Sequence, residues 1–258
     1  MTWFPQTGAG SLAQLPLHRR RTWRAITNVL ENGEQVSLPD HAAGQIEWRL
    51  SYRDLSDAEV AKLHDLFAAC QGSARAFGFA DPIANLLTWS EDLSHADWQA
   101  GLLSITHGAT DPLGTARAST LSNPSAGLQA ISQTVNIPGD YVTCCSAWIR
   151  SATPTEVSLQ RDGSASVKTA EPAWKRLFVS ATGNAGAEQT TVSLSVPAGA
   201  IVDVWGLQLE AQPYPSQYRR TTGASRIYPE TYFGADELSV KSTGPGLSAC
   251  ELILLSRV

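Results

Sequence analysis

Short stretches of alternating apolar and polar residues, separated by Gly, Pro and Asp, recur through the middle of this chain from Asn85 to about Thr222. The candidate strands among them are residues 142–149, 156–160, 176–180, 191–196 and 201–210. Alternation with a period of two places successive side chains on opposite faces of a strand. Short strands with regular turn signals are typical of a β-sandwich or jelly roll. We therefore expect an all-β protein.

Composition agrees with this expectation. The chain has 258 residues, of which 43% are hydrophobic and 17% charged, so it can bury a core and is too apolar for disorder. Its 20 Gly and 14 Pro, with a single Met, favour strands and turns over a helical bundle. The length alone allows one large sandwich or two domains.

The segment before this region has a different texture. The opening to about Leu38 shows little periodicity and is expected to be a loose arm. Residues 46–53 alternate clearly and predict a half-buried strand. Ser56 and Glu59 then form a capping-box pattern, which predicts a helix over about 56–71 that ends at a glycine. A short strand at 76–79 follows and ends at an Asp-Pro pair.

The texture changes again after Gly223. Residues 226–233, 237–241 and 249–256 are expected to be three further strands. The apolar residues of the last two of these strands would then pack with Trp48 and Leu50 of the strand at 46–53.

Two stretches resemble known families. The segment Gln45–Pro82, with the pattern W.L.Y..LS, a helix and then F.F.DP, resembles the minor and distal tail proteins of long-tailed phages and prophages. The stretch opened by NLLTWSEDLSHADW and closed by VDVWGLQLEAQPYPSQYRRT looks like the carbohydrate-binding-type jelly rolls of phage tail and fibre proteins. The resemblance implies a β-sandwich tail domain with one helix, formed by 1–83 plus 223–258, and an inserted jelly roll at 84–222.

The charge and the cysteines exclude several classes of protein. A net charge of −5, without a Lys/Arg stripe between aromatics, predicts no nucleic-acid partner. No apolar run approaches the roughly 20 residues that span a bilayer, and the N-terminus lacks a signal-peptide pattern. We therefore expect synthesis in the host cytoplasm without Sec-type export, and location in a virion tail. The four cysteines show no CxxC spacing, so we expect free thiols and no zinc.

No pattern of catalytic residues is evident, and we expect no enzymatic activity and no cofactor. The histidines form no i, i+4 pair, and no serine lies in a G-x-S-x-G elbow. Glu91 or Asp92 with Asp97 could form a glycosidase pair if their loop folds back. Ser90, Glu91 and Asp92 more often cap their own turn, and a structural calcium ion is a third alternative there.

Aromatic residues point to a glycan surface, because sugar CH faces stack on aromatic rings. Five of the eight tryptophans lie between 84 and 222. Trp148 and Trp205 lie inside alternating strands and are expected in the core. The candidates for glycan binding are those near turns, namely Trp89, Trp98, Trp174, Tyr214 and Tyr218, although the PYPSQY run could instead pack a domain seam.

The N-terminal arm is expected to contact other subunits. Its candidate interface residues are Trp3, Phe4, Trp23, Arg19, Arg20, Arg21 and Arg24, although exposed basic runs are most often only solvated. The sequence thus predicts a structural component of a phage or prophage tail tip that associates with itself and other tail proteins. Its jelly roll would contact bacterial surface polysaccharide. The alternatives are a free-standing lectin-like protein and, less favoured, a glycan hydrolase.

Overall fold

The computed structural model describes residues 1–257, except the side chains of His41 and Ala42. Two compact units share the chain. The first contains Met1–Gly8, Leu12–Phe79 and the chain from Tyr228 onward, and the second contains Ala9–Ser11 and Ala80–Ile227. The expected division into 1–83 plus 223–258 and 84–222 stays a prediction.

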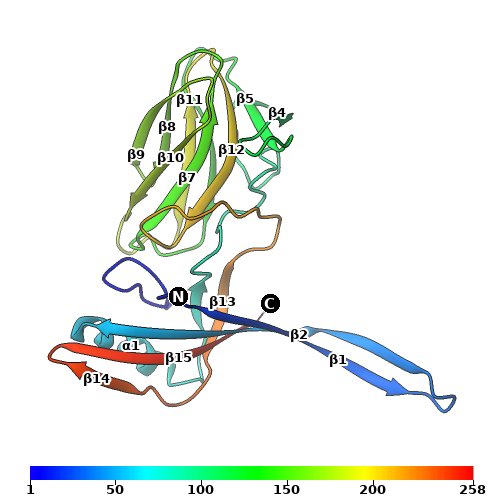
Figure 1. Cartoon of the computed structure of the whole chain (residues 1–258), viewed down its shortest axis with the longest axis vertical. Coiled ribbons are helices and arrows are strands. Elements are labelled where there is room, and N and C mark those ends of the chain that lie inside the picture. The colour runs from blue at the N-terminus through cyan, green and yellow to red at the C-terminus, as the bar shows by residue number, and fades with distance from the viewer. Residues whose placement is uncertain (258) are drawn as a thin grey trace. The chain divides into compact units, whose positions relative to one another are not determined.

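The first unit is built on one antiparallel sheet of six strands with the order β1-β2-β15-β13-β3, in which β14 also pairs with β15 (Figure 1). The strands are β1 (His18–Val29), β2 (Gln35–Leu55), β3 (Phe77–Ala80), β13 (Ile227–Phe233), β14 (Val240–Gly244) and β15 (Leu247–Arg257). The three strands expected after Gly223 are therefore present. Segments from the two ends of the chain lie side by side in this sheet.

The pairing of β2 with β15 forms the centre of this unit. Trp48 is opposite Leu254, and Leu50 is opposite Leu252, in antiparallel register. Trp48 is fully buried and its indole N–H donates to Ser256 Oγ at 3.0 Å. Its ring packs edge-on against Phe79, with 5.3 Å between ring centroids. β15 thus adds Leu252 and Leu254 to the sheet face that carries Trp48 and Leu50.

The single helix, α1 (Asp57–Cys70), begins and ends as the sequence predicts. Ser56 is its N-cap, and the capping box with Glu59 is complete. Gln71 closes the helix in the left-handed conformation and is followed by Gly72. Its buried side chains are Leu63, Leu66 and Cys70, whereas Val60 and Phe67 are half-buried.

The expectation of a loose N-terminal arm is wrong. Strands β1 and β2 form a long hairpin, in which 24–29 pair with 35–40, whereas β15 pairs with β2 only from Gln45 onward. All twelve residues of β1 are exposed. Neither face of the distal half of the hairpin is covered by other described residues. Its sequence therefore shows little apolar–polar alternation, and the two strands could not be predicted from that pattern.

The second unit is an antiparallel sandwich with two sheets, β10-β7-β12-β5-β4 and β6-β11-β8-β9. Its strands are β4 (Ser104–Ala109), β5 (Ala118–Ser122), β6 (Gln129–Val135), β7 (Thr143–Arg150), β8 (Thr155–Arg161), β9 (Ser164–Ala170), β10 (Lys175–Ala181), β11 (Thr190–Val196) and β12 (Ile201–Glu210). The all-β fold with one helix and a jelly-roll sandwich is confirmed. All five strands expected in this region are present.

The strands that the sequence did not reveal in this unit are β4, β5, β6 and β9. Three of them, β4, β6 and β9, lie at sheet edges. β4 and β9 bury few side chains, so their sequences need not alternate, whereas β6 buries Ile131, Gln133 and Val135 in alternation and has a polar residue at the middle buried position. No helix among residues 1–257 is long and apolar enough to cross a bilayer.

Candidate functional site

The outward face of the five-stranded sheet carries a row of large side chains. Arg176 on β10 is opposite Trp148 on β7, and Trp148 is opposite Trp205 on β12. The side chains of β7 that point into the sandwich, such as Cys145, are buried. Trp148 points to the opposite face, as do Ser146 and Arg150, and it is half-buried. The row therefore presents one half-buried indole between a guanidinium and a second indole.

A bulge in β12 shapes the end of this row. The register between β12 and β7 shifts after Trp205, where Gly206 adopts a φ of +68° that other residues rarely take. A Cβ at Gly206 would lie 3.3 Å from both Trp148 and Tyr218. The Tyr218 ring packs edge-on against Trp205, with 4.6 Å between centroids, and its hydroxyl lies 2.8 Å from Ser90 Oγ. Burial raises the pKa of Tyr218, so its phenol stays neutral.

These aromatics enclose a pocket of about 330 Å³, here called the aromatic pocket. Its lining residues are Leu113, Arg117, Trp148, Arg176, Trp205, Gln217, Tyr218 and Arg220. A second pocket of about 430 Å³, the polar pocket, shares Arg117 and Arg220 with it. The two pockets are therefore neighbouring parts of one surface of the jelly-roll unit.

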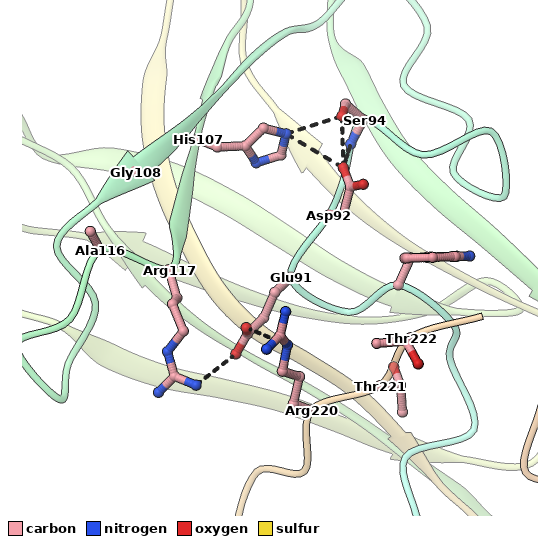
Figure 2. Close-up of a pocket in the computed structure, with 11 residues that line it drawn as sticks. Glu91, Asp92, Ser94, His107, Gly108, Ala116, Arg117, Arg220, Thr221 and Thr222 are labelled. Carbon is pink, nitrogen blue, oxygen red and sulfur yellow. Dashed lines mark hydrogen bonds and ion pairs between the residues drawn. The ribbon is translucent and has the colours of Figure 1, made fainter. Parts of the chain in front are cut away.

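Ion pairs organise the polar pocket (Figure 2). The Glu91 carboxylate lies 2.9 Å from Arg220 Nε and 3.5 Å from Arg117 Nη1. Arg117 also lies 3.5 Å from Asp111, whose side chain is fully buried. The Glu91 side chain is only 6% exposed, whereas those of Arg117 and Arg220 are 39% and 60% exposed. The carboxylates thus lie beneath the guanidiniums and hold them toward solvent.

A serine, a histidine and an aspartate meet at the other side of the polar pocket (Figure 2). His107 Nε2 lies 3.0 Å from Ser94 Oγ and 3.5 Å from Asp92 Oδ1, and Ser94 Oγ donates to the same Asp92 oxygen at 2.7 Å. The Ser94 hydrogen bond lowers the pKa of Asp92. In a hydrolytic triad the carboxylate and the serine contact opposite ring nitrogens. Here both lie at Nε2, and Nδ1 lies 3.0 Å from Ser119 Oγ.

The three carboxylates considered for glycosidase chemistry are engaged separately. Glu91 pairs with two arginines, Asp92 accepts from Ser94, and Asp97 accepts from Thr88 Oγ1 at 2.6 Å. These contacts fit the alternative in which the loop residues bond to their own surroundings. Among the side chains that the structure describes, no group of three or more His, Cys, Asp and Glu is placed to hold a metal ion, and the four thiols are free and buried.

The structure separates the five predicted glycan residues. Tyr218 lines the aromatic pocket, and Trp89 lines the polar pocket with its ring stacked on His95 at 4.2 Å. Trp98 is only 6% exposed, and its indole N–H donates to the Trp89 carbonyl. The prediction that Trp98 lies on an open surface is therefore wrong. Trp174 lies under the Arg150 guanidinium, outside both pockets, and Tyr214 is 72% exposed, also outside both.

Several lining residues were assigned elsewhere or missed. Trp205 is 5% exposed, which agrees with a core position, but Trp148 is half-buried and lines the pocket, so its assignment to the core is wrong. Trp148 alternates with the inward residues of β7 and falls on the same face as the polar Ser146 and Arg150, which was a signal that its side chain points outward. Arg117, Arg176 and Arg220 come from distant segments, and no local pattern marks them as neighbours.

The predicted interface residues also differ in environment. Phe4 is fully buried against Phe79, with 5.5 Å between centroids, and therefore offers no surface to a partner. The Trp3 ring lies against Gly78, where a Cβ would come within 2.6 Å of it. Arg19 lies over the Trp48 ring at 5.5 Å, and Arg20 and Arg24 pair with Glu47 and Asp40. Trp23 is 61% exposed and Arg21 is exposed, as an interface requires.

No protein-family model and no curated protein matches the chain. Solved structures with similar folds include a xylan-binding CBM22-1 domain from Paenibacillus barcinonensis Xyn10C, with 14% identity and a TM-score of 0.41 over 53% of this chain and 97% of that one. TmCBM61, solved with β-1,4-galactotriose, shows 14% identity and a TM-score of 0.38 over 48% and 97%.

The enzymatically active domain of bacteriophage CBA120 tailspike protein 4 is similar at 13% identity with a TM-score of 0.40, over 51% of this chain. The similar part spans only 22% of that tailspike chain. The structural neighbours of this chain are thus jelly rolls of the carbohydrate-binding-module type, one of them in a phage tailspike.

Proposed function

We propose that the jelly-roll unit binds a glycan of the bacterial surface in the aromatic pocket and does not cleave it. The observation that carries the proposal is the row of Trp148 and Trp205 with Tyr218, set among arginines in a pocket of about 330 Å³. An aromatic floor accepts the CH face of a sugar ring, and fixed polar groups at its edge bind the hydroxyls. The separate engagement of Glu91, Asp92 and Asp97 favours binding over hydrolysis.

The test is an array of bacterial capsular and O-antigen polysaccharides, probed with the full chain. We expect at least one glycan to bind, and Trp148→Ala to weaken that binding by about five- to thirtyfold, since stacking of one ring contributes roughly 1–2 kcal/mol. Phe178→Ala is the matched control, because Phe178 is a 45% exposed aromatic on β10 outside the pocket. An array without signal, or equal loss in both variants, would contradict the proposal.

A second function, assembly into a phage or prophage tail tip, is favoured by the distal half of the β1–β2 hairpin. β1 is the edge of its sheet, so its outer backbone groups have no neighbouring strand among the described residues. The exposed apolar side chains around it are Trp23, Ile26, Val29, Leu30, Val36 and Leu38. A long, exposed apolar edge strand is a template for pairing. We propose that it pairs with a second copy of this chain, because tail-tip parts assemble around a symmetry axis.

Light scattering on the full chain tests the assembly proposal. We expect an oligomer, and Trp23→Ser with Ile26→Ser should shift it to monomer, because both changes remove apolar area from the edge strand. Val167→Ser, at a 51% exposed valine of the jelly-roll unit, should leave the oligomer intact. A wild-type chain that stays monomeric at high concentration would refute self-association through the hairpin.

A further inference from the structure

The charge of the aromatic pocket is opposite to that of the whole chain. The chain carries a formal net charge of −5, yet three arginines and no Asp or Glu belong to the pocket's lining. Glu91 and Asp111 lie next to two of these arginines but are almost fully buried, at 6% and 0% side-chain exposure. Three guanidiniums beside two carboxylates leave an excess positive charge, and it lies on the side that a ligand would approach.

Arg176 is the one pocket arginine without a carboxylate partner among the described residues. Its Nη2 donates to Ser146 Oγ at 3.0 Å, but its Nε has no hydrogen-bond partner in the described part of the chain. No described carboxylate lies within ion-pair distance of Arg176, whereas Arg117 and Arg220 both pair with Glu91. A guanidinium has five N–H donors arranged to bind a planar oxyanion through two parallel hydrogen bonds. Arg176 is therefore the group best able to receive an anion.

The sheet register places Arg176 beside the sugar platform. Arg176 is the direct cross-strand neighbour of Trp148, on the same face of the sheet. Directly opposite residues in an antiparallel pair have Cβ atoms roughly 5 Å apart. A sugar ring stacked on Trp148 would thus have one edge next to the guanidinium. An oxyanion on that edge would meet Arg176 without leaving the aromatic floor.

We infer that the glycan bound in the aromatic pocket carries an oxyanion, either a uronic acid carboxylate or a sugar phosphate, and that Arg176 receives it. This inference rests on the proposed glycan-binding function. Arg117 and Arg220, which line both pockets, extend the positive surface toward the polar pocket. In a polyanionic glycan with one charge on each repeat, the charge that follows the one bound by Arg176 would contact Arg117 and Arg220. A neutral glycan would leave these exposed guanidiniums without a ligand partner.

Matched polymers test the inference with the full chain. The probes are hyaluronan, alginate and polygalacturonate, each beside its form with carboxyl groups reduced to hydroxyls, and a poly(ribitol phosphate) teichoic acid. We expect an acidic polymer to bind at least about tenfold more tightly than its reduced form. Binding of the teichoic acid alone identifies phosphate as the oxyanion. Equal binding of acidic and reduced forms overturns the inference but leaves glycan binding intact. No binding by any acidic probe also overturns the inference, whereas glycan binding itself is overturned only by a polysaccharide array without signal.

Variants then test Arg176 itself. Arg176→Gln should weaken binding of the acidic polymer by at least about tenfold and change binding of the reduced polymer less than about twofold. Lys175→Gln is the matched control, because it removes the same charge from an exposed neighbour on β10 that does not line the pocket. Equal effects of the two variants on the acidic polymer overturn the role of Arg176.

Salt dependence of the unmodified chain tests charge recognition without any variant. Raising NaCl from about 50 mM to about 500 mM shortens the screening length several-fold, so affinity for the acidic polymer should fall while affinity for the reduced polymer stays constant. The same affinity for the acidic polymer at both concentrations overturns the inference.

Discussion

Arg161 and Arg176 show how one residue type serves two purposes in the jelly-roll unit. Arg161 is fully buried; its Nε donates to Thr143 Oγ1 at 2.7 Å and its Nη2 to the carbonyls of Gly139 and Tyr141. Its Nη1 lies 3.1 Å from Asp162. Arg176, in contrast, is half-buried at the edge of a pocket. Arg161 stabilises the fold, whereas Arg176 is available to a ligand.

We predict that Arg161→Met lowers the free energy of unfolding of the jelly-roll unit by about 3 kcal/mol. The change removes the donor from two buried carbonyls and leaves the Asp162 carboxylate without its ion pair. Arg176→Met should cost less than about 1 kcal/mol, because its guanidinium makes one hydrogen bond to a side chain. Urea unfolding followed by tryptophan fluorescence measures both, and equal losses would refute the distinction.

At the scale of elements, the start of α1 depends on one local motif. Ser56 Oγ accepts from the Glu59 backbone N–H, while the Glu59 carboxylate accepts from the Ser56 and Gly8 backbone N–H groups. Partial burial raises the pKa of Glu59, but the hydrogen bonds from Ser56 and Gly8 outweigh it and leave the pKa below its ordinary value of 4.5. The helix start and the N-terminal segment thus share one carboxylate.

We predict that Ser56→Ala costs about 1 kcal/mol of stability at pH 7. A carboxyl group with a lowered folded pKa stabilises the protein above its unfolded pKa and loses this contribution as pH falls through the folded value. The cost of Ser56→Ala should therefore shrink as the pH falls through the lowered pKa of Glu59, where this carboxyl group becomes protonated. Chemical unfolding at pH 7 and pH 3 measures it. Ser51→Ala, at an exposed serine of β2, should change stability by less than about 0.5 kcal/mol.

At the scale of the whole molecule, the main segment of the jelly-roll unit, Ala80–Ile227, begins and ends at adjacent positions. The Asp81 N–H donates to the Arg226 carbonyl at 2.9 Å, so the two connecting segments lie side by side. The other unit builds its sheet from strands on both sides of this insertion, through the pairing of β2 with β15. Each unit therefore has its own sheets and its own core.

We predict that replacing residues 85–222 with a short Gly/Ser linker leaves a folded first unit. Loop closure changes by only about 0.6 kcal/mol for each doubling of loop length, and the two ends are already adjacent. The excised fragment 80–227 should fold alone and keep its glycan binding. Circular dichroism and thermal unfolding measure both products. Loss of cooperative unfolding in either one would contradict the division into two domains.

Local patterns in the sequence were sufficient for the helix and for the strands with one buried face. Ser56 and Glu59 determine where α1 begins through contacts three residues apart, and the alternation around Trp48 and along β8 or β10 follows from burial of one strand face. The hairpin and the edge strands β4 and β9 escaped prediction, because their side chains are mostly exposed and alternation reports the burial of one strand face. β6 escaped prediction because the polar Gln133 occupies one of its buried positions.

The candidate site was decided by the tertiary structure. Trp98, which is near a turn, is buried and donates a hydrogen bond to the Trp89 carbonyl. Trp148, which is inside a strand, instead lines a pocket. Alternation shows that a strand has two faces, but only packing shows which face a sandwich covers. Arg117, Arg176 and Arg220 become neighbours because strand order and the segment after β12 bring them to one surface. The sequence by itself therefore determined most elements, and long-range packing determined the chemistry that they present.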